Sequence, residues 1–114
     1  MEFVNLPNGN YAYLGDKLER YCLNPEHSKG KNKAALFRKK LGITLECKDV
    51  LETALLEAAI RAEANLIRRD QFGTYYNTRF FMQTETGEAW ILGCWIIRSG
   101  ETFPRLTNAY PVRK

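Results

Sequence analysis

The only histidine of the chain, His27, lies in a lysine-rich stretch and could transfer protons near neutral pH. Lys29, Lys31 and Lys33 follow it at alternate positions. Cations of this kind balance the charge on a phosphodiester while an imidazole moves protons. The alternative interpretation is a loop histidine that hydrogen-bonds a backbone carbonyl, and the residue types alone leave both interpretations open.

The lysines also coincide with the expected start of a helix near Lys31, where unpaired N–H groups attract anions. A lysine at this end opposes the helix dipole, so Lys31 and Lys33 favour a bound anion that offsets the repulsion. The stretch lacks the glycine spacing of a phosphate-binding P-loop. A solvated basic turn therefore remains the alternative.

A second polar set lies near the C-terminus, in the segment PRLTNAYP (104–111). Regular strand alternation places Asn108 and Tyr110 on one face and Arg105 on the other. A bulge at the start of this strand, next to Pro104, could bring Arg105 round to the first face. The alternative interpretation is an edge strand with one wet face.

Three helices are expected to position these groups. The first spans about 16–23, where Asp16 and Glu19 have the spacing of a capping box and Pro25 follows. The second runs over about 32–41 and ends at a glycine. The third and longest covers about 48–70, because apolar residues recur there at helical spacing: Leu51, Leu55, Ala58, Ala62 and Leu66.

The remainder has the pattern of β structure. Segments 74–84, 89–98 and 105–112 are strands separated by short turns, which implies an antiparallel meander with 89–98 in its centre. The Asn8-Gly9 pair predicts a tight turn with a short strand on either side. Helices followed by strands predict an α+β fold, with the helices on one face of an antiparallel sheet of about three to five strands.

Trp90 and Trp95 lie five residues apart in the central strand and therefore point to opposite faces. One is expected to pack under the helices. The other could offer a stacking surface for a base, although packing in the core or at an edge is the commoner role of tryptophan.

Length and composition limit the class of protein. The 114 residues fit one domain over 1–114, and a net charge of +4 is compatible with RNA or an acidic protein partner. Three cysteines without paired spacing, together with one histidine, predict reduced thiols and neither a metal site nor a cofactor. The chain contains no signal peptide and no membrane span, so a cytoplasmic location is expected.

Several short motifs occur in an order that resembles a known bacterial family. They are Leu23-Asn24-Pro25-x-His27-x-x-Gly30-x-x-Lys33-Ala34, then Phe37, Leu41-Gly42, Phe72-Gly73-x-x-Tyr76, Trp95-Ile96-Ile97, and Pro104-Arg105-Leu106 with Ala109-Tyr110-Pro111. Over about residues 6–112 the chain resembles the domain of unknown function family 6883. That family has no settled activity, and its members resemble toxin modules that are found beside small partner genes or at the ends of larger toxins.

The layout also looks more distantly like the barnase/EndoU/RelE-like group of metal-independent ribonucleases. This resemblance implies a site in which Asn108 and Tyr110 on the last strand work with His27 and Lys33 on the helical part. The chain departs from the EndoU-like pattern in two ways. Position 108 is Asn instead of Thr or Ser, and the second histidine is absent, so Arg105 or a lysine would replace it.

Two functions follow as expectations. The first is an RNA-cleaving, toxin-like domain in which His27, Lys33 and Tyr110 are catalytic, while Lys31, Arg105 and Asn108 bind the substrate. The 2′-hydroxyl would attack the adjacent phosphate and leave a cyclic phosphate. The alternative is a non-enzymatic module that binds RNA or a protein partner, such as a small cognate antitoxin-like protein. The first requires the named side chains to converge in space.

Overall fold

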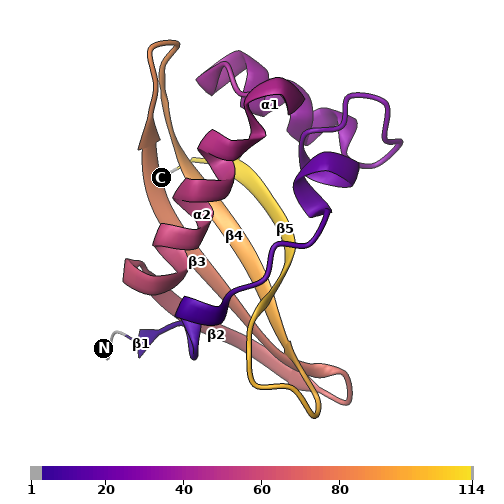
Figure 1. The fold of residues 1–114 in the computed structure, drawn as a ribbon, viewed down its shortest axis with the longest axis vertical. Coiled ribbons are helices and arrows are strands. Elements are labelled where there is room, and N and C mark those ends of the chain that lie inside the picture. The colour runs from indigo at the N-terminus through magenta and orange to yellow at the C-terminus, as the bar shows by residue number, and fades with distance from the viewer. Residues whose placement is uncertain (1–3, 114) are drawn as a thin grey trace.

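A computed structural model describes residues 4–113 and has an α+β fold, as predicted (Figure 1). The sheet is antiparallel, with five strands in the order β1-β2-β3-β4-β5. The elements in chain order are β1 (Val4–Asn5), η1 (Gly9–Tyr11), η2 (Leu18–Cys22), α1 (Lys31–Leu41), η3 (Leu45–Cys47), α2 (Lys48–Arg61), β2 (Glu63–Asp70), β3 (Gly73–Gln83), β4 (Glu88–Arg98) and β5 (Arg105–Val112).

The core lies between α2 and one face of the sheet. Leu51 and Leu55 of α2 are fully buried, as are Ile91 and Trp95 of β4, an interior strand between β3 and β5. The indole of Trp95 donates a hydrogen bond to Thr78 Oγ1 at 3.0 Å, which satisfies both buried polar groups. Full burial of an apolar side chain such as Leu51, Leu55 or Ile91 contributes about 1.5–3 kcal/mol, so the packing of these side chains holds α2 on the sheet.

The prediction of one long helix over 48–70 is wrong beyond Arg61, because the chain turns there into β2. Ala62 already has an extended backbone, with φ −77° and ψ 152°. Leu66 and Ile67, which extend the apolar stripe in the sequence, are 51% exposed on β2. Long-range pairing of β2 with β3 and β1 decides the conformation here and overrides the helical spacing.

The predicted first helix shortens to the π-helical turn η2. Asp16 forms an ion pair with Arg20 and no cap, while Glu19 accepts a hydrogen bond from Lys48. Of the turn predicted at Asn8-Gly9 with a strand on either side, the turn and the preceding strand β1 are present, and Asn8 has a positive φ of 53°, but the second strand is wrong. The 3₁₀ turn η1 follows Asn8 in place of that strand, and β1 pairs with β2.

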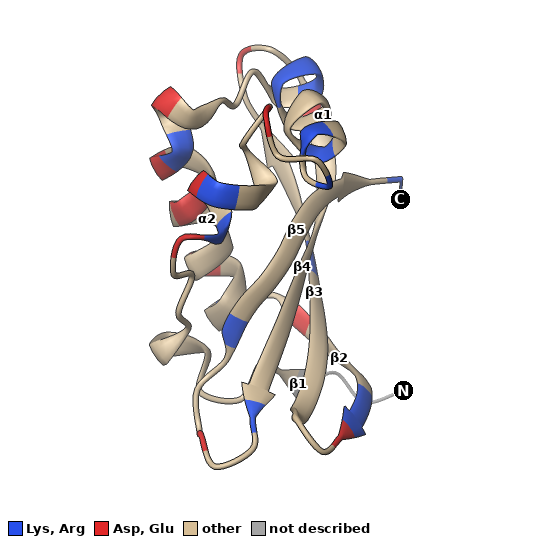
Figure 2. Cartoon of the chain, turned by 90° about the vertical axis from the view of Figure 1, so that its right-hand side faces the viewer, with Lys and Arg blue, Asp and Glu red and all other residues tan. Residues whose placement is uncertain are grey.

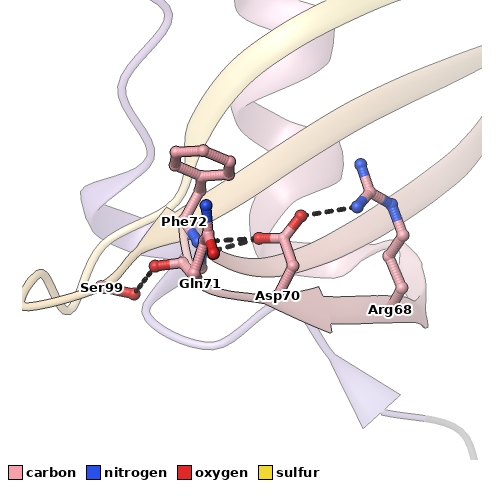
Figure 3. Close-up of polar contacts among 6 residues, drawn as sticks. Arg68, Asp70, Gln71, Phe72 and Ser99 are labelled. Carbon is pink, nitrogen blue, oxygen red and sulfur yellow. Dashed lines mark hydrogen bonds and ion pairs between the residues drawn. The ribbon is translucent and has the colours of Figure 1, made fainter.

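The hairpin between β2 and β3 ends in a turn that the Asp70 carboxylate organises (Figure 3). Asp70 Oδ1 accepts hydrogen bonds from the backbone N–H groups of Phe72 at 2.8 Å and Gly73 at 3.2 Å. Its Oδ2 lies 2.6 Å from Arg68 Nη1. Ser99, in the loop after β4, donates to the backbone oxygen of Gln71 at 2.9 Å. Hydrogen bonds to Asp70 at the end of β2 and from Ser99 in the loop after β4 therefore both stabilise the turn.

A bulge interrupts the pairing of β5 with β4. Cys94 pairs with Asn108 and Trp95 with Leu106, so Thr107 is the extra residue of β5. The Thr107 hydroxyl donates to the backbone oxygen of Cys94 at 3.1 Å. The bulge thus lies inside the strand, and not beside Pro104 as the sequence analysis considered.

We call the sheet face that α2 does not cover the open face; it carries Phe81, Trp90, Leu92, Cys94 and Tyr110. Figures 1 and 2 show α2 on one side of the sheet and α1 at one end of β5, and no helix of residues 4–113 on the open face. Trp95 is 1% exposed under α2, whereas Trp90 is half-buried, which confirms that the two indoles point to opposite faces. No helix of residues 4–113 is long and apolar enough to cross a membrane.

Candidate functional site

Lys33 is the centre of a group of side chains where α1 meets β5. Its ammonium lies 3.1 Å from the hydroxyl of Tyr21, 5.1 Å from the centroid of the Tyr21 ring and 5.4 Å from that of Tyr110. Among residues 4–113, no carboxylate lies within ion-pair distance of this ammonium. Lys33 is thus a half-buried cation whose neighbours are aromatic rings and a hydroxyl.

The sequence of α1 explains why Lys33 faces β5. Residues four apart share a helix face, so Lys33 lies one turn from Phe37, which is fully buried. Gly30 then allows the helix to begin against η2, since a Cβ at Gly30 would lie 2.2 Å from the backbone oxygen of Tyr21. The glycine and the buried phenylalanine together bring Lys33 to Tyr21.

His27 organises the turn that precedes α1. Its Nδ1 accepts hydrogen bonds from the backbone N–H groups of Lys29 and Gly30, both at 3.0 Å. The neutral ring therefore carries its proton on Nε2. Its edge packs on Tyr21, with ring centroids 4.9 Å apart and an angle of 82° between the planes. His27 accepts from backbone N–H groups, where the alternative interpretation of the sequence had it bonded to a carbonyl.

Asn108 and Tyr110 approach this group from β5. Asn108 Oδ1 accepts a hydrogen bond from the Ala109 N–H at 2.9 Å and lies 4.0 Å from the Cys22 thiol. Nδ2 of Asn108 donates no hydrogen bond within residues 4–113. We name Tyr21, Cys22, His27, Lys33, Asn108 and Tyr110 the Lys33 cluster.

Neither thiol near Lys33 is suited to nucleophilic chemistry. Burial raises the pKa of Cys22 to about 11, against smaller lowering effects from the Ala109 N–H and Lys33. Burial also raises the pKa of Cys94, and the charge of Lys33 partly opposes this. A raised pKa leaves the thiol protonated at neutral pH. The charge of Lys33 thus acts on Cys22 in η2 and on Cys94 in β4.

Arg105 does not join the Lys33 cluster. The bulge gives it the same face as Asn108 by register, but its guanidinium bonds Glu101 through Nε at 2.8 Å and Nη2 at 2.9 Å. It also lies over the rings of Tyr13 and Phe103, 5.2 and 4.9 Å from their centroids. The hydrogen bond from Arg105 lowers the pKa of Glu101, so this pair is an ionised unit at the far end of β5.

Lys31 lies on another side of α1. It lines a hollow of about 510 Å³ together with Leu23, Pro25, Ala34 and Arg38, among others. The six residues proposed from sequence therefore divide into two sets. The structure connects His27 to Lys33 through Tyr21, brings Lys33 to Tyr110 and places Asn108 beside Cys22, and it leaves Arg105 and Lys31 outside.

Sequence reasoning missed the part played by Tyr21, which contacts both His27 and Lys33. Its sequence signal was weak, because Tyr21 falls within the helix expected over about 16–23 and lies outside the motifs that carry the family resemblance. Among residues 4–113, no three His, Cys, Asp or Glu side chains are grouped to hold a metal ion. The Lys33 cluster itself supplies an ammonium group and two tyrosine rings, which suit anion binding and stacking.

Comparisons with known proteins place the chain in a family and give no activity. Curated proteins and solved structures yield no match. The more distant resemblance to barnase, EndoU and RelE-like ribonucleases thus has no support from them. One family model matches residues 5–113, nearly the whole chain and all of the Lys33 cluster. The chain belongs to the family described as Domain of unknown function (DUF6883).

Proposed function

We propose that the domain binds RNA, with a phosphate of the backbone at Lys33. The observation that carries this proposal is the Lys33 ammonium, half-buried between two tyrosine rings without a carboxylate partner in residues 4–113. A phosphate oxygen would complete its coordination, and Asn108, on the same face of β5 as Tyr110, offers its Nδ2 as a second donor. The Tyr110 ring offers a surface on which a base can stack.

The charge of α1 supports the same ligand. The helix contains five basic residues and no acidic one in the sequence KNKAALFRKKL. Figure 2 shows this basic helix at the end of β5 that carries the cluster. A positive surface of this kind attracts the phosphate backbone without regard to sequence, and the binding weakens as salt rises.

RNA cleavage is a second candidate, which the contact between His27 and Tyr21 favours. The imidazole lies one side chain away from the Lys33 ammonium, because Tyr21 contacts both. In such a reaction the 2′-oxygen bonds to phosphorus and the bond to the 5′-oxygen breaks. A general acid must give a proton to that leaving oxygen, and His27 could do so only as an imidazolium that is protonated on both ring nitrogens.

The 2′-hydroxyl proton needs a base, and this places cleavage second. Nδ1 of His27 already accepts two backbone hydrogen bonds and Nε2 carries the single proton of a neutral ring, so the observed turn presents neither a free base nor an imidazolium acid. The turn would have to open before His27 could accept a proton. Binding needs no such change, which is why the geometry favours it.

Lys33→Gln tests the binding proposal by fluorescence anisotropy with a labelled single-stranded RNA. Loss of one desolvated phosphate contact should weaken the affinity at least tenfold, which corresponds to about 1.4 kcal/mol. Lys39→Gln removes the same charge from the exposed part of the same helix and is the matched control, with an expected change below about threefold. Equal effects of the two substitutions would contradict a phosphate site at Lys33.

The cleavage candidate is tested on the same RNA in the presence of a chelator, with products separated on a denaturing gel. A cyclic phosphate product from the wild type that His27→Asn abolishes would make the domain a ribonuclease. Binding that depends on Lys33 without any cleaved product would leave RNA binding as the function.

A further inference from the structure

We propose that the RNA held at Lys33 continues across the open face of the sheet, and that one base enters a hollow on β2, β3 and β4. This inference rests on the proposed function and extends it by naming the path and the class of substrate, a single strand. The hollow measures about 390 Å³ and lies on the sheet face opposite α2. Its lining residues are Glu63, Asn65, Asn77, Arg79, Trp90 and Leu92.

A row of paired residues connects this hollow to the Lys33 cluster. Asn65 pairs with Asn77, Asn77 with Cys94, and Cys94 with Asn108. Directly paired residues of antiparallel strands point to the same face. Three strand spacings separate the ends of the row, a distance of about 14 Å. A few nucleotides of a single strand can span this distance.

A second row runs parallel to the first. Arg79 pairs with Leu92, and Leu92 pairs with Tyr110. Tyr110 on β5 and Arg79 on β3 thus lie in one row across the sheet, with Leu92 between them. Two adjacent rows, each with one end in the hollow and the other in the Lys33 cluster, define the path.

The lining of the hollow suits a nucleobase, which has apolar flat faces and a polar edge. Trp90 and Leu92 supply the apolar surface, and Trp90 is held edge-on by Phe81 with ring centroids 5.6 Å apart. The amides of Asn65 and Asn77 both donate and accept hydrogen bonds. Unstacked bases are recognised through their polar edges in this way, and an aromatic side chain packs on the ring.

The charges around the path favour RNA over a protein partner. Arg79 is exposed at the hollow and can contact a phosphate. The field of Lys33 extends to Cys94, in the middle of the first row. Glu63, the one acidic residue of the hollow, can accept a hydrogen bond from a base amino group, as carboxylates do from cytosine.

Trp90 provides a direct test. A single-stranded oligouridine of about ten nucleotides should quench the fluorescence of Trp90, because a base stacks on it. The dinucleotide UpU reaches only Lys33 and should bind without quenching. Trp90→Phe should remove the quenching, since Trp95 is buried on the other side of the sheet.

Substitutions separate this inference from the proposed function. Asn77→Ala and Arg79→Gln should each weaken the oligonucleotide about three- to tenfold and leave UpU unchanged, whereas Lys33→Gln weakens both ligands. Lys48→Gln at the start of α2 removes a cation that pairs with Glu19, away from the hollow and the Lys33 cluster, and is the control. Melting temperatures confirm that each variant is folded.

The outcomes are distinguishable. If Lys33→Gln weakens both RNAs but the hollow variants bind the oligonucleotide like wild type without a change in quenching, the path is wrong and the phosphate site stands. If Lys33→Gln has no effect on either RNA, the proposed function fails. Loss of binding to a protein partner, but not to RNA, in the hollow variants would assign the open face to that partner and overturn the path.

Discussion

Two turns of this domain are built in the same way, although one connects helical segments and the other connects strands. At each turn one side-chain atom accepts the backbone N–H groups of the second and third following residues. His27 Nδ1 does this for Lys29 and Gly30, and Asp70 Oδ1 does it for Phe72 and Gly73. Each turn ends at a glycine whose added Cβ would lie 2.2 Å from a backbone oxygen.

The two turns differ in the cation that lies beside them. Arg68 pairs with Asp70 at 2.6 Å, so the charges at the strand turn compensate each other. Lys33 beside the helical turn contacts a hydroxyl and two rings instead. The hydrogen bonds that His27 accepts stabilise its turn, and the same arrangement occurs at Asp70, where no functional site is proposed. The uncompensated lysine is what distinguishes the helical turn.

The largest effect is expected from Gly30→Ala. The new methyl group would meet the backbone oxygen of Tyr21 and separate α1 from η2, at a cost of about 3 kcal/mol in the free energy of unfolding. Gly73→Ala should cost a similar amount, because its φ of 153° is also unfavourable for alanine. Urea denaturation measures both values.

Gly100→Ala is the control for the two glycine substitutions. Its φ is 85°, but its added Cβ would have no neighbour within 4 Å, so only the backbone cost of about 1 kcal/mol remains. Equal losses at all three positions would show that close packing does not explain the two turn glycines.

His27→Ala should have the next largest effect. It removes the acceptor of two N–H groups, and a loss of about 1–2 kcal/mol follows from the comparable loss of a helix cap. His27→Asn can accept the same N–H groups in a turn and should restore most of the stability. If the asparagine variant is as unstable as the alanine variant, the hydrogen-bonding account of this turn is incorrect.

Asp70→Asn should change the pH dependence of stability. Desolvation opposes ionisation of Asp70, but hydrogen bonds from Phe72, Tyr75, Arg68 and Gly73 outweigh it and lower the pKa of the carboxyl. A lowered pKa stabilises the fold above the ordinary value of about 3.9, and this stability is lost as the pH falls through the folded-state value. Wild type should therefore lose more stability than Asp70→Asn between about pH 6 and about pH 3. Parallel pH profiles would contradict this.

Ser99→Ala should have the smallest effect, about 0.5 kcal/mol. It removes one hydrogen bond to Gln71, while the backbone bond from Ser99 to Phe72 at 2.9 Å stays. Thermal unfolding should show a small shift in Tm. A shift as large as that of His27→Ala would mean that Ser99, more than Asp70, holds the strand turn.

Local patterns in the sequence were sufficient for α1 and for β3, β4 and β5. The helix α1 has a clear stop at Gly42, whose φ is 69°, and the strands alternate or are separated by turns. The boundary between α2 and β2 could not be found in this way. The apolar spacing of α2 continues through Ala62 and Leu66, and only pairing with distant β3 makes this segment a strand.

The grouping of His27, Lys33, Asn108 and Tyr110 was expected only from the distant resemblance to EndoU-like ribonucleases, which the comparisons do not support, and not from local patterns. The position of Arg105 could not be foreseen, because its bond to Glu101 depends on the loop before β5. The hollow on the open face could not be predicted from the sequence either. Asn65, which lines it, was assigned to a helix, so its pairing with Asn77 had no place in the prediction.

The extra residue Thr107 has a genetic consequence. Leu106 and Asn108, on either side of it, already pair with the consecutive residues Trp95 and Cys94. Loss of the Thr107 codon would therefore join Leu106 to Asn108 in a regular strand and leave Asn108 and Tyr110 on the face that they now share. Loss of the Ala109 codon, two positions later, would instead move Tyr110 to the opposite face, so the same kind of mutation has opposite outcomes within one strand.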